Sequence, residues 1–218
     1  MGGALCRCLR NRTTSDRCSG WFIACRSGHA AVADPGVRRR GCQGCAPTGR
    51  PGPPTPQRRM TQKLLFVCLG NICRSPAAEG VFLHLLDERG LSDQFVVDSA
   101  GTGGWHVGNP ADRRMQAAAN RRGINLPSRA RQICLEDFSS FDLVLTMDDS
   151  NLAAVQGLAR EAGSQATARI KPMLSYARRF NETEVPDPYY GGDAGFEHVL
   201  DLLEDACANL LDELSPQA

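Results

Sequence analysis

The residues best suited to chemistry lie in a short stretch that runs from a cysteine to an arginine. Cys68 and Arg74 are separated by the five residues Leu-Gly-Asn-Ile-Cys. The apolar run 64–67 before the cysteine predicts a buried strand, and the amphipathic run 77–89 after the arginine predicts a helix. A tight turn from a strand into a helix directs backbone N–H groups and the positive end of the helix dipole toward one spot. The stretch therefore predicts an anion site that contains a thiol, and such a position favours the thiolate form.

The residue types of this loop fit the binding of a tetrahedral oxyanion. We expect Arg74 to bind two oxygens of the anion through its guanidinium fork. The Cys68 thiolate would then lie behind the central atom, in line with a leaving group. The residues expected to contribute the cradle are Leu69, Gly70, Asn71, Ile72, Cys73 and Ser75.

Four residues of the loop have more specific expected tasks. Ser75 and Pro76 are expected at the N-cap and the first position of the helix, and the Ser75 hydroxyl is expected to stabilise the thiolate. Gly70 and Asn71 are residue types that tolerate the positive φ of a tight cradle. A cysteine that only packs under a helix is the plainer alternative, but it does not account for these residues at fixed offsets. A Walker-A phosphate loop is excluded because no Gly-Lys-Ser/Thr sequence is present.

A thiolate that displaces an alkoxide or phenoxide needs an acid to protonate the leaving oxygen. Asp187 is the best candidate, because two flanking prolines place it on a stiff loop in the sequence Val-Pro-Asp-Pro-Tyr-Tyr-Gly-Gly. Tyr189 and Tyr190 follow it and could flank a planar ring. The local alternative is an ordinary turn, since Asp-Pro and Gly-Gly are turn signals. The cysteine loop upstream favours the functional interpretation.

Hydrophobic patterning predicts strands that alternate with helices. The strands are expected at 63–67, 94–98, 141–146 and 168–171, and the helices at 77–89, 112–122, 149–162 and 196–214. This alternation predicts right-handed βαβ units and a parallel sheet, with ligands beyond the carboxyl ends of the strands. Four arginines of the second helix are expected on a solvated face, namely Arg113, Arg114, Arg121 and Arg122.

Charge and cysteine usage divide the chain into a tail, 1–59, and a domain, 60–218. The tail carries a net charge of +9 and the remainder −8, within 218 residues of net charge +1. An acidic domain argues against general nucleic-acid binding. Six of the ten cysteines lie in the tail, so the domain is expected in a reducing compartment. No apolar run approaches the roughly 18 residues of a membrane span.

The tail is rich in Arg, Gly, Pro, Ser and Cys and is expected to be disordered. It fits an organelle transit peptide, being rich in arginine and poor in acidic residues. It also fits an upstream extension with Met60 as the start of the functional protein. Cys42 and Cys45 form one CxxC, a weak metal signal because a structural zinc site needs four ligands. The expected location is cytoplasmic, or an organelle stroma or matrix if the tail is a transit peptide.

Residues 67–76, taken with 187–190, closely resemble the low-molecular-weight protein tyrosine phosphatases. The likeness covers about residues 63–214, and further matching segments lie at 98–102, 105–108, 128–133 and 147–151. The resemblance implies a three-layer α/β/α fold with a four-stranded parallel sheet, of the phosphotyrosine phosphatase I-like type. It also implies no metal and no cofactor, and phosphotyrosine-containing proteins as substrates. Some members have a histidine where Arg122 stands, so the supporting role of that histidine is not assigned.

The resemblance also implies roles for individual residues. Cys68 would be the nucleophile, Arg74 the phosphate clamp, and Asp187 the acid and then the base for hydrolysis of a phosphocysteine. An aromatic rim would hold the substrate ring, and Cys73 would be able to pair reversibly with Cys68 under oxidation. The rim residues are Trp105 with Tyr189 or Tyr190.

Three other functions are possible on such a chain. Arsenate reduction needs further cysteines that resolve the intermediate, usually a close pair, whereas Cys134 and Cys207 are far apart. Phosphoarginine hydrolysis is associated with a threonine where Ile72 stands, so Ile72 favours phosphotyrosine. A non-catalytic phosphate-binding module is the least favoured, because every catalytic position is filled.

Overall fold

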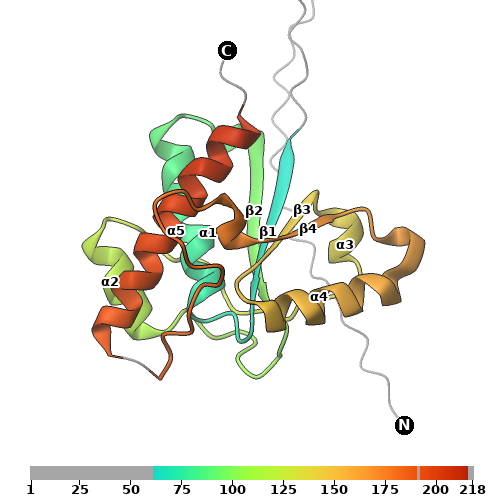
Figure 1. The fold of residues 1–218 in the computed structure, drawn as a ribbon, viewed down its shortest axis with the longest axis horizontal. Helices are drawn as coiled ribbons and strands as arrows, with labels where there is room; N and C mark the ends of the chain where they lie inside the picture. Colours follow the sequence, from blue (N-terminus) through green and yellow to red (C-terminus); the bar gives the residue numbers. More distant parts are fainter. Residues whose placement is uncertain (1–60, 191, 216–218) are drawn as a thin grey trace, which may run out of the picture. The chain divides into compact units, whose positions relative to one another are not determined.

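A four-stranded parallel sheet forms the centre of the computed structural model, which describes residues 61–190 and 192–215 (Figure 1). The strand order is β2-β1-β3-β4. The strands are β1 (Gln62–Cys68), β2 (Phe95–Gly101), β3 (Leu143–Thr146) and β4 (Arg169–Pro172). The predictions made for residues 1–59 lie outside the described residues.

Helices cover both faces of the sheet, which gives the predicted α/β/α layers (Figure 1). α1, α2 and α5 pack on one face, and α3 and α4 on the other. The helices are α1 (Arg74–Glu88), α2 (Arg113–Arg121), α3 (Asp137–Ser140), α4 (Asp149–Ala162) and α5 (Asp193–Leu214), with short 3₁₀ turns at Ser92–Gln94, Gly163–Gln165 and Met173–Tyr176. None of these helices combines the length and apolarity needed to cross a membrane.

The core follows from the alternation of side chains along the buried central strand β1. Leu64, Phe66 and Cys68 belong to the cluster under α1 and α5, whereas Leu65 and Val67 belong to the cluster under α4. Both faces of β1 are therefore covered, as is usual for a parallel sheet. The thiol at its end is held in a strand that is packed on both sides.

All eight predicted strands and helices are present, and the differences lie at their ends. β2 continues to Gly101 instead of ending at residue 98, because its small last residues pair with β1, with Gly101 opposite Cys68. α5 begins at Asp193, three residues before the predicted start. The short helix α3 and the 3₁₀ turns were not predicted. The polar sequence Asp-Phe-Ser-Ser of α3 is too short for a periodic signal.

The topology places the loop after β1 at a natural binding position. β1 pairs with β2 on one side and with β3 on the other, so the chain order of the strands reverses at β1. Ligands in such sheets bind beyond the carboxyl ends of the strands at this point. Cys68 is the last residue of β1, and α1 begins six residues later at Arg74.

Candidate active site

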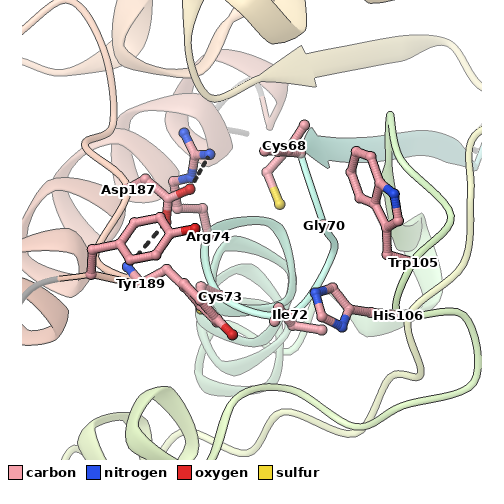
Figure 2. Close-up of a pocket in the computed structure, with 11 residues that line it drawn as sticks. Cys68, Gly70, Ile72, Cys73, Arg74, Trp105, His106, Asp187 and Tyr189 are labelled. Atoms are coloured by element: carbon pink, nitrogen blue, oxygen red, sulfur yellow. Dashed lines mark hydrogen bonds and ion pairs between the residues drawn. The ribbon is translucent and has the colours of Figure 1, made fainter.

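The loop between β1 and α1 forms the floor of a pocket of about 260 Å³ (Figure 2). Figure 2 shows the Cys68 sulfur near the centre, with Asp187 and Tyr189 on one side and Trp105 and His106 on the other. Nearly all the predicted site residues meet here. The lining residues are Cys68, Leu69, Gly70, Ile72, Cys73, Arg74, Trp105, His106, Asp187, Tyr189 and Tyr190.

The Cys68 thiol is buried and has two polar neighbours. Its Sγ lies 3.1 Å from Ser75 Oγ, and the backbone N–H of Asn71 donates to it over 3.3 Å. The Ser75 hydroxyl has a second possible acceptor, the Ala100 carbonyl at 3.2 Å. A thiolate is the stronger acceptor, so its formation would draw the hydroxyl proton toward sulfur. The arrangement therefore stabilises negative charge on Cys68.

The prediction that Ser75 is the N-cap of α1 is wrong, and its hydroxyl contacts Cys68 instead. The N-cap of α1 is Cys73, and it makes no side-chain capping bond. Ser75 lies one residue inside the helix, where its hydroxyl also accepts a bond from Asn71 Nδ2 at 2.9 Å. The hydroxyl is therefore used by Cys68 and by the loop that follows it.

Asn71 fixes the shape of the loop from behind the pocket. It has a φ of 54°, and it is the only non-glycine residue with positive φ in the described part of the chain. Its Nδ2 donates to Ser75 and to Ser99 Oγ at 2.9 Å, and its Oδ1 accepts from the Arg131 N–H at 2.8 Å. Ser99 in turn donates to the buried carboxylate of Glu79 at 2.6 Å. Burial raises the pKa of Glu79, while bonds from Ser99 and Ser128 oppose that rise.

Gly70 was also expected to have positive φ, and that prediction is wrong, since the residue is not among the glycines in that region. Its lack of a side chain matters for a different reason. A Cβ on Gly70 would lie 3.1 Å from His106 Cδ2, which is tighter than an ordinary contact. Glycine at this position therefore lets the rim loop approach the cradle.

Arg74 is buried between two carboxylates. Its Nη1 donates to Asp148 Oδ2 at 2.5 Å and to the Val185 carbonyl at 3.2 Å, and its Nη2 donates to Asp187 Oδ2 at 3.0 Å. Burial alone would lower the pKa of Arg74, but the charges of Cys68, Asp148 and Asp187 raise it. Arg74 thus keeps its charge and its orientation without a ligand.

Asp187 is paired with this arginine through one oxygen and with its own loop through the other. Its Oδ1 accepts the backbone N–H of Tyr189 at 3.1 Å, while Oδ2 faces Arg74. Its side chain is 41 % exposed, on the open side of the pocket. An anion that binds Arg74 competes with Oδ2, so binding would free the carboxyl group for a leaving oxygen.

The aromatic rim is exposed, as binding of a large substrate requires. Trp105 is 73 % exposed, Tyr190 94 % and Tyr189 39 %. The two tyrosine rings meet edge to face, with centroids 5.1 Å apart. Trp105 faces Tyr189 across the cleft in Figure 2. Exposed aromatic side chains therefore line the same pocket as the Cys68 thiol.

Cys73 lines the same pocket but has a different environment. It is 4 % exposed, and burial, together with the negative charge of Asp112, raises its pKa to about 12. It is therefore a neutral thiol at physiological pH. No disulfide is present among the four described cysteines, and reversible pairing of Cys73 with Cys68 stays a prediction.

Asp148, Glu79 and Ser99 contribute to this site and were missed as individual residues. Asp148 and Ser99 lie within segments that carry the family resemblance, which was the available signal. Glu79 looked like an ordinary charge on an amphipathic helix, and its 5 % exposure was not visible in the sequence.

The arginines of α2 were predicted to lie on a solvated face. This holds only in part, because two of them form ion pairs with α5. Arg122 donates to Glu197, Asp201 and Glu204 of α5 at distances between 2.6 and 3.1 Å. Arg121 also pairs with Glu197. These ion pairs join α2 to α5.

A buried thiol that accepts a backbone N–H, a buried arginine and a partly exposed carboxylate meet in one pocket, and this set of groups suits thiol-based attack on a phosphoryl group. The family model described as low molecular weight phosphotyrosine protein phosphatase matches residues 63–218. The chain belongs to this family and is a cysteine-based phosphatase.

Three similar proteins illustrate this relationship. A putative low molecular weight protein-tyrosine-phosphatase of Synechocystis sp. is 52 % identical over 155 residues, covering 71 % of this chain and 98 % of that protein. The crystal structure of a protein tyrosine phosphatase from Entamoeba histolytica with Hepes in its active site has a TM-score of 0.67 and 43 % identity, covering 71 % of this chain and 97 % of that one. The structure of a Drosophila arginine phosphatase has a TM-score of 0.68 and 34 % identity, covering 72 % and 100 %.

Proposed function

We propose that this chain hydrolyses phosphotyrosine in proteins, and small aryl phosphates, through a phosphocysteine on Cys68 and without a metal. The observation that carries the proposal is the position of Cys68. Its buried sulfur lies at the floor of the pocket, 3.1 Å from Ser75 Oγ, and it accepts the backbone N–H of Asn71. Arg74 and Asp187 line the same pocket.

In the first step, phosphate oxygens bind the loop amides and the guanidinium of Arg74. This binding displaces the Asp187 carboxyl group from Arg74. The Cys68 thiolate attacks phosphorus, and an S–P bond forms as the bond to the phenolic oxygen breaks. Protonated Asp187 gives its proton to that oxygen, so tyrosine leaves as the neutral phenol.

In the second step, water takes the position of the departed phenol. The Asp187 carboxylate, which lost its proton in the first step, removes a proton from this water. The water oxygen attacks phosphorus, the S–P bond breaks, and inorganic phosphate forms. The sulfur leaves as a thiolate that Ser75 and the Asn71 amide again stabilise.

The shape of the pocket supports an aromatic substrate. Trp105 and Tyr189 form opposite walls, and Ile72 adds an apolar contact near the floor (Figure 2). Ile72, by its resemblance to phosphotyrosine-specific members, also favours tyrosine over phosphoarginine. Of the four described cysteines, only Cys68 and Cys73 line the pocket, which disfavours arsenate reduction. We further propose a reducing compartment, the cytoplasm, since oxidation would inactivate the thiol.

The test uses the purified full chain with p-nitrophenyl phosphate and a phosphotyrosyl peptide. We expect hydrolysis of both in the presence of EDTA, and no turnover by Cys68→Ser. Ser139→Ala, which changes an exposed residue of α3, is a matched control and should retain activity. A strict metal requirement, or full activity of Cys68→Ser, would overturn the thiolate mechanism. Preference for a phosphoarginyl peptide would overturn the assignment to tyrosine.

A further inference from the structure

Arg114 joins the phosphate-binding loop to the loop that carries Asp187. It is the second residue of α2, it is not one of the residues that line the catalytic pocket, and its side chain is 41 % exposed. Three sets of contacts on different elements converge on it. They suggest a role that neither its exposure nor its sequence context indicates.

The first set fixes the guanidinium on one side. Arg114 Nε donates to Asp112 Oδ1 at 3.1 Å and Nη2 donates to Oδ2 at 3.0 Å, so the fork is occupied by one carboxylate. Asp112 Oδ1 also accepts the Arg114 backbone N–H at 2.8 Å, as the N-cap of α2. These hydrogen bonds from Arg114 lower the pKa of Asp112. The pair is thus charged at neutral pH, and its geometry is set by the helix start.

The second contact ties this pair to the cradle itself. The backbone N–H of Asp112 donates to the carbonyl of Ile72 at 2.7 Å. Ile72 lies within the loop that follows Cys68, so the start of α2 has a fixed position relative to the nucleophile. Because Arg114 is bonded to Asp112, its guanidinium also has a fixed position relative to the nucleophile.

The third set lies on the other side of the guanidinium. Its central carbon is 4.7 Å from the ring centroid of Phe196 and 5.4 Å from that of Tyr189, both within the range of cation–π attraction. Phe196 is buried in the first turn of α5 and gives a rigid surface. Tyr189 belongs to the loop between Asp187 and α5, and its backbone N–H donates to Asp187 Oδ1.

The start of the loop that carries Asp187 is fixed by contacts with other parts of the chain. Val185 N donates to the Met147 carbonyl at 2.8 Å, and the Val185 carbonyl accepts from Arg74. Beyond Asp187, Pro188 has no N–H to donate, but it is buried and lies against Gly195 of α5, whereas Tyr190 is 94 % exposed. Two contacts therefore hold the chain after the acid, the packing of Pro188 on α5 and the stacking of Tyr189 on Arg114, and the second of these connects the acid's loop to α2.

We propose that Arg114 is a positioning residue for the general acid. It holds the Tyr189 ring against α2 and so keeps the Asp187 carboxyl group at a fixed distance from the phosphate-binding loop. This role rests on the proposed function, because it concerns the acid of that reaction. Arg114 itself touches neither the phosphate nor the reacting atoms. Its loss should impair protonation of the leaving oxygen and leave phosphate binding intact.

The test is the dependence of kcat/KM on the leaving group across a series of aryl phosphates. Arg114→Met keeps the apolar stem and removes both the charge and the fork. We expect kcat/KM to fall about three- to tenfold for phenols of high pKa, as loss of a contact of this strength implies, and to change little for p-nitrophenyl phosphate. Inhibition by inorganic phosphate should be unchanged.

Two further variants separate positioning from general effects. Arg113→Met changes a neighbouring exposed arginine that makes no ion pair within the described residues, and it should behave as the wild type. Arg114→Lys keeps a charge beside Tyr189 but cannot occupy both oxygens of Asp112, and it should fall between Arg114→Met and the wild type. This variant also serves if Arg114→Met does not fold.

The outcomes are distinct from those that concern the function itself. A wild-type chain without aryl phosphatase activity would refute the proposed function. If the wild type is active and both Arg114 variants show the same leaving-group dependence as the wild type, the positioning role alone is refuted. An equal loss for all phenols together with weaker inhibition by phosphate would also refute it, because Arg114 would then support the cradle.

Discussion

Replacement of Asn71 probes how the loop is held in shape. Asn71→Ala removes three side-chain bonds, two donated to Ser75 and Ser99 and one accepted from the Arg131 N–H. It also places an alanine at a φ of 54°, where only glycine and asparagine are readily accommodated. Asn71→Gly removes the same bonds but tolerates the backbone conformation. The two variants therefore separate hydrogen bonding from backbone strain.

The magnitude follows from these two contributions. Two buried hydrogen bonds and one partly buried one, at about 1 kcal/mol each, give a loss of about 3 kcal/mol in the free energy of unfolding for Asn71→Gly. Left-handed backbone at alanine adds about 1 kcal/mol, which gives about 4 kcal/mol for Asn71→Ala. Asn71 is 2 % exposed, so water does not replace these bonds in the folded protein.

Urea unfolding followed by circular dichroism measures both losses, provided that the slope with urea is unchanged. Asn120→Ala, at an exposed position near the end of α2, is the matched control and should stay within about 0.5 kcal/mol of the wild type. Turnover of p-nitrophenyl phosphate should fall with both Asn71 variants, because Ser75 loses a bond that orients it toward Cys68. The reasoning is refuted if Asn71→Ala is more stable than Asn71→Gly, or if both lose under 1 kcal/mol.

Two further predictions concern thiol reactivity and stability. Iodoacetamide at pH 8 should label Cys73 far more slowly in the folded protein than in urea, because its pKa of about 12 leaves almost no thiolate; equal rates, read by peptide mass spectrometry, would contradict this. Arg122→Ala should lower the free energy of unfolding by about 1–2 kcal/mol at neutral pH, since three partly exposed carboxylates lose their shared cation. Arg121 and Arg122 lower the pKa of Glu197, so this pairing stabilises the fold above the ordinary glutamate pKa and is lost as Glu197 protonates in more acid solution. The difference between Arg122→Ala and the wild type should therefore shrink in acid, and a difference independent of pH would refute the assignment.

Periodicity predicted the elements of the sheet well because each strand and helix presents a regular apolar pattern. The same pattern placed Cys68 at the carboxyl end of a central strand, where the topology requires a site. Most of the residues expected at the cradle and the rim line one pocket, whereas Asn71 and Ser75 are buried and do not line it. Local sequence is informative here because the cradle is made from consecutive residues.

What the sequence did not predict depends on contacts between distant segments. Asp148 meets Arg74 only because β3 lies beside β1, and 74 positions separate the two residues. Glu79 looks like a surface charge in its helix, but it is turned inward toward Ser99 on β2. The predicted N-cap is wrong for a local reason, because α1 begins at Arg74 and Ser75 therefore lies inside its first turn, where the hydroxyl contacts Cys68. Long-range polar partners of this kind have no periodic signal.

The central claim is that the phosphoryl group passes through Cys68. Asp187→Ala should form the S–P bond readily with p-nitrophenyl phosphate, whose leaving group needs little protonation, but should hydrolyse it slowly without a base. Mass spectrometry of the acid-quenched and digested Asp187→Ala protein during turnover should therefore find a phosphoryl group on the peptide that contains Cys68. A phosphoryl group on another residue, or steady turnover with Cys68 unmodified throughout, would contradict the account.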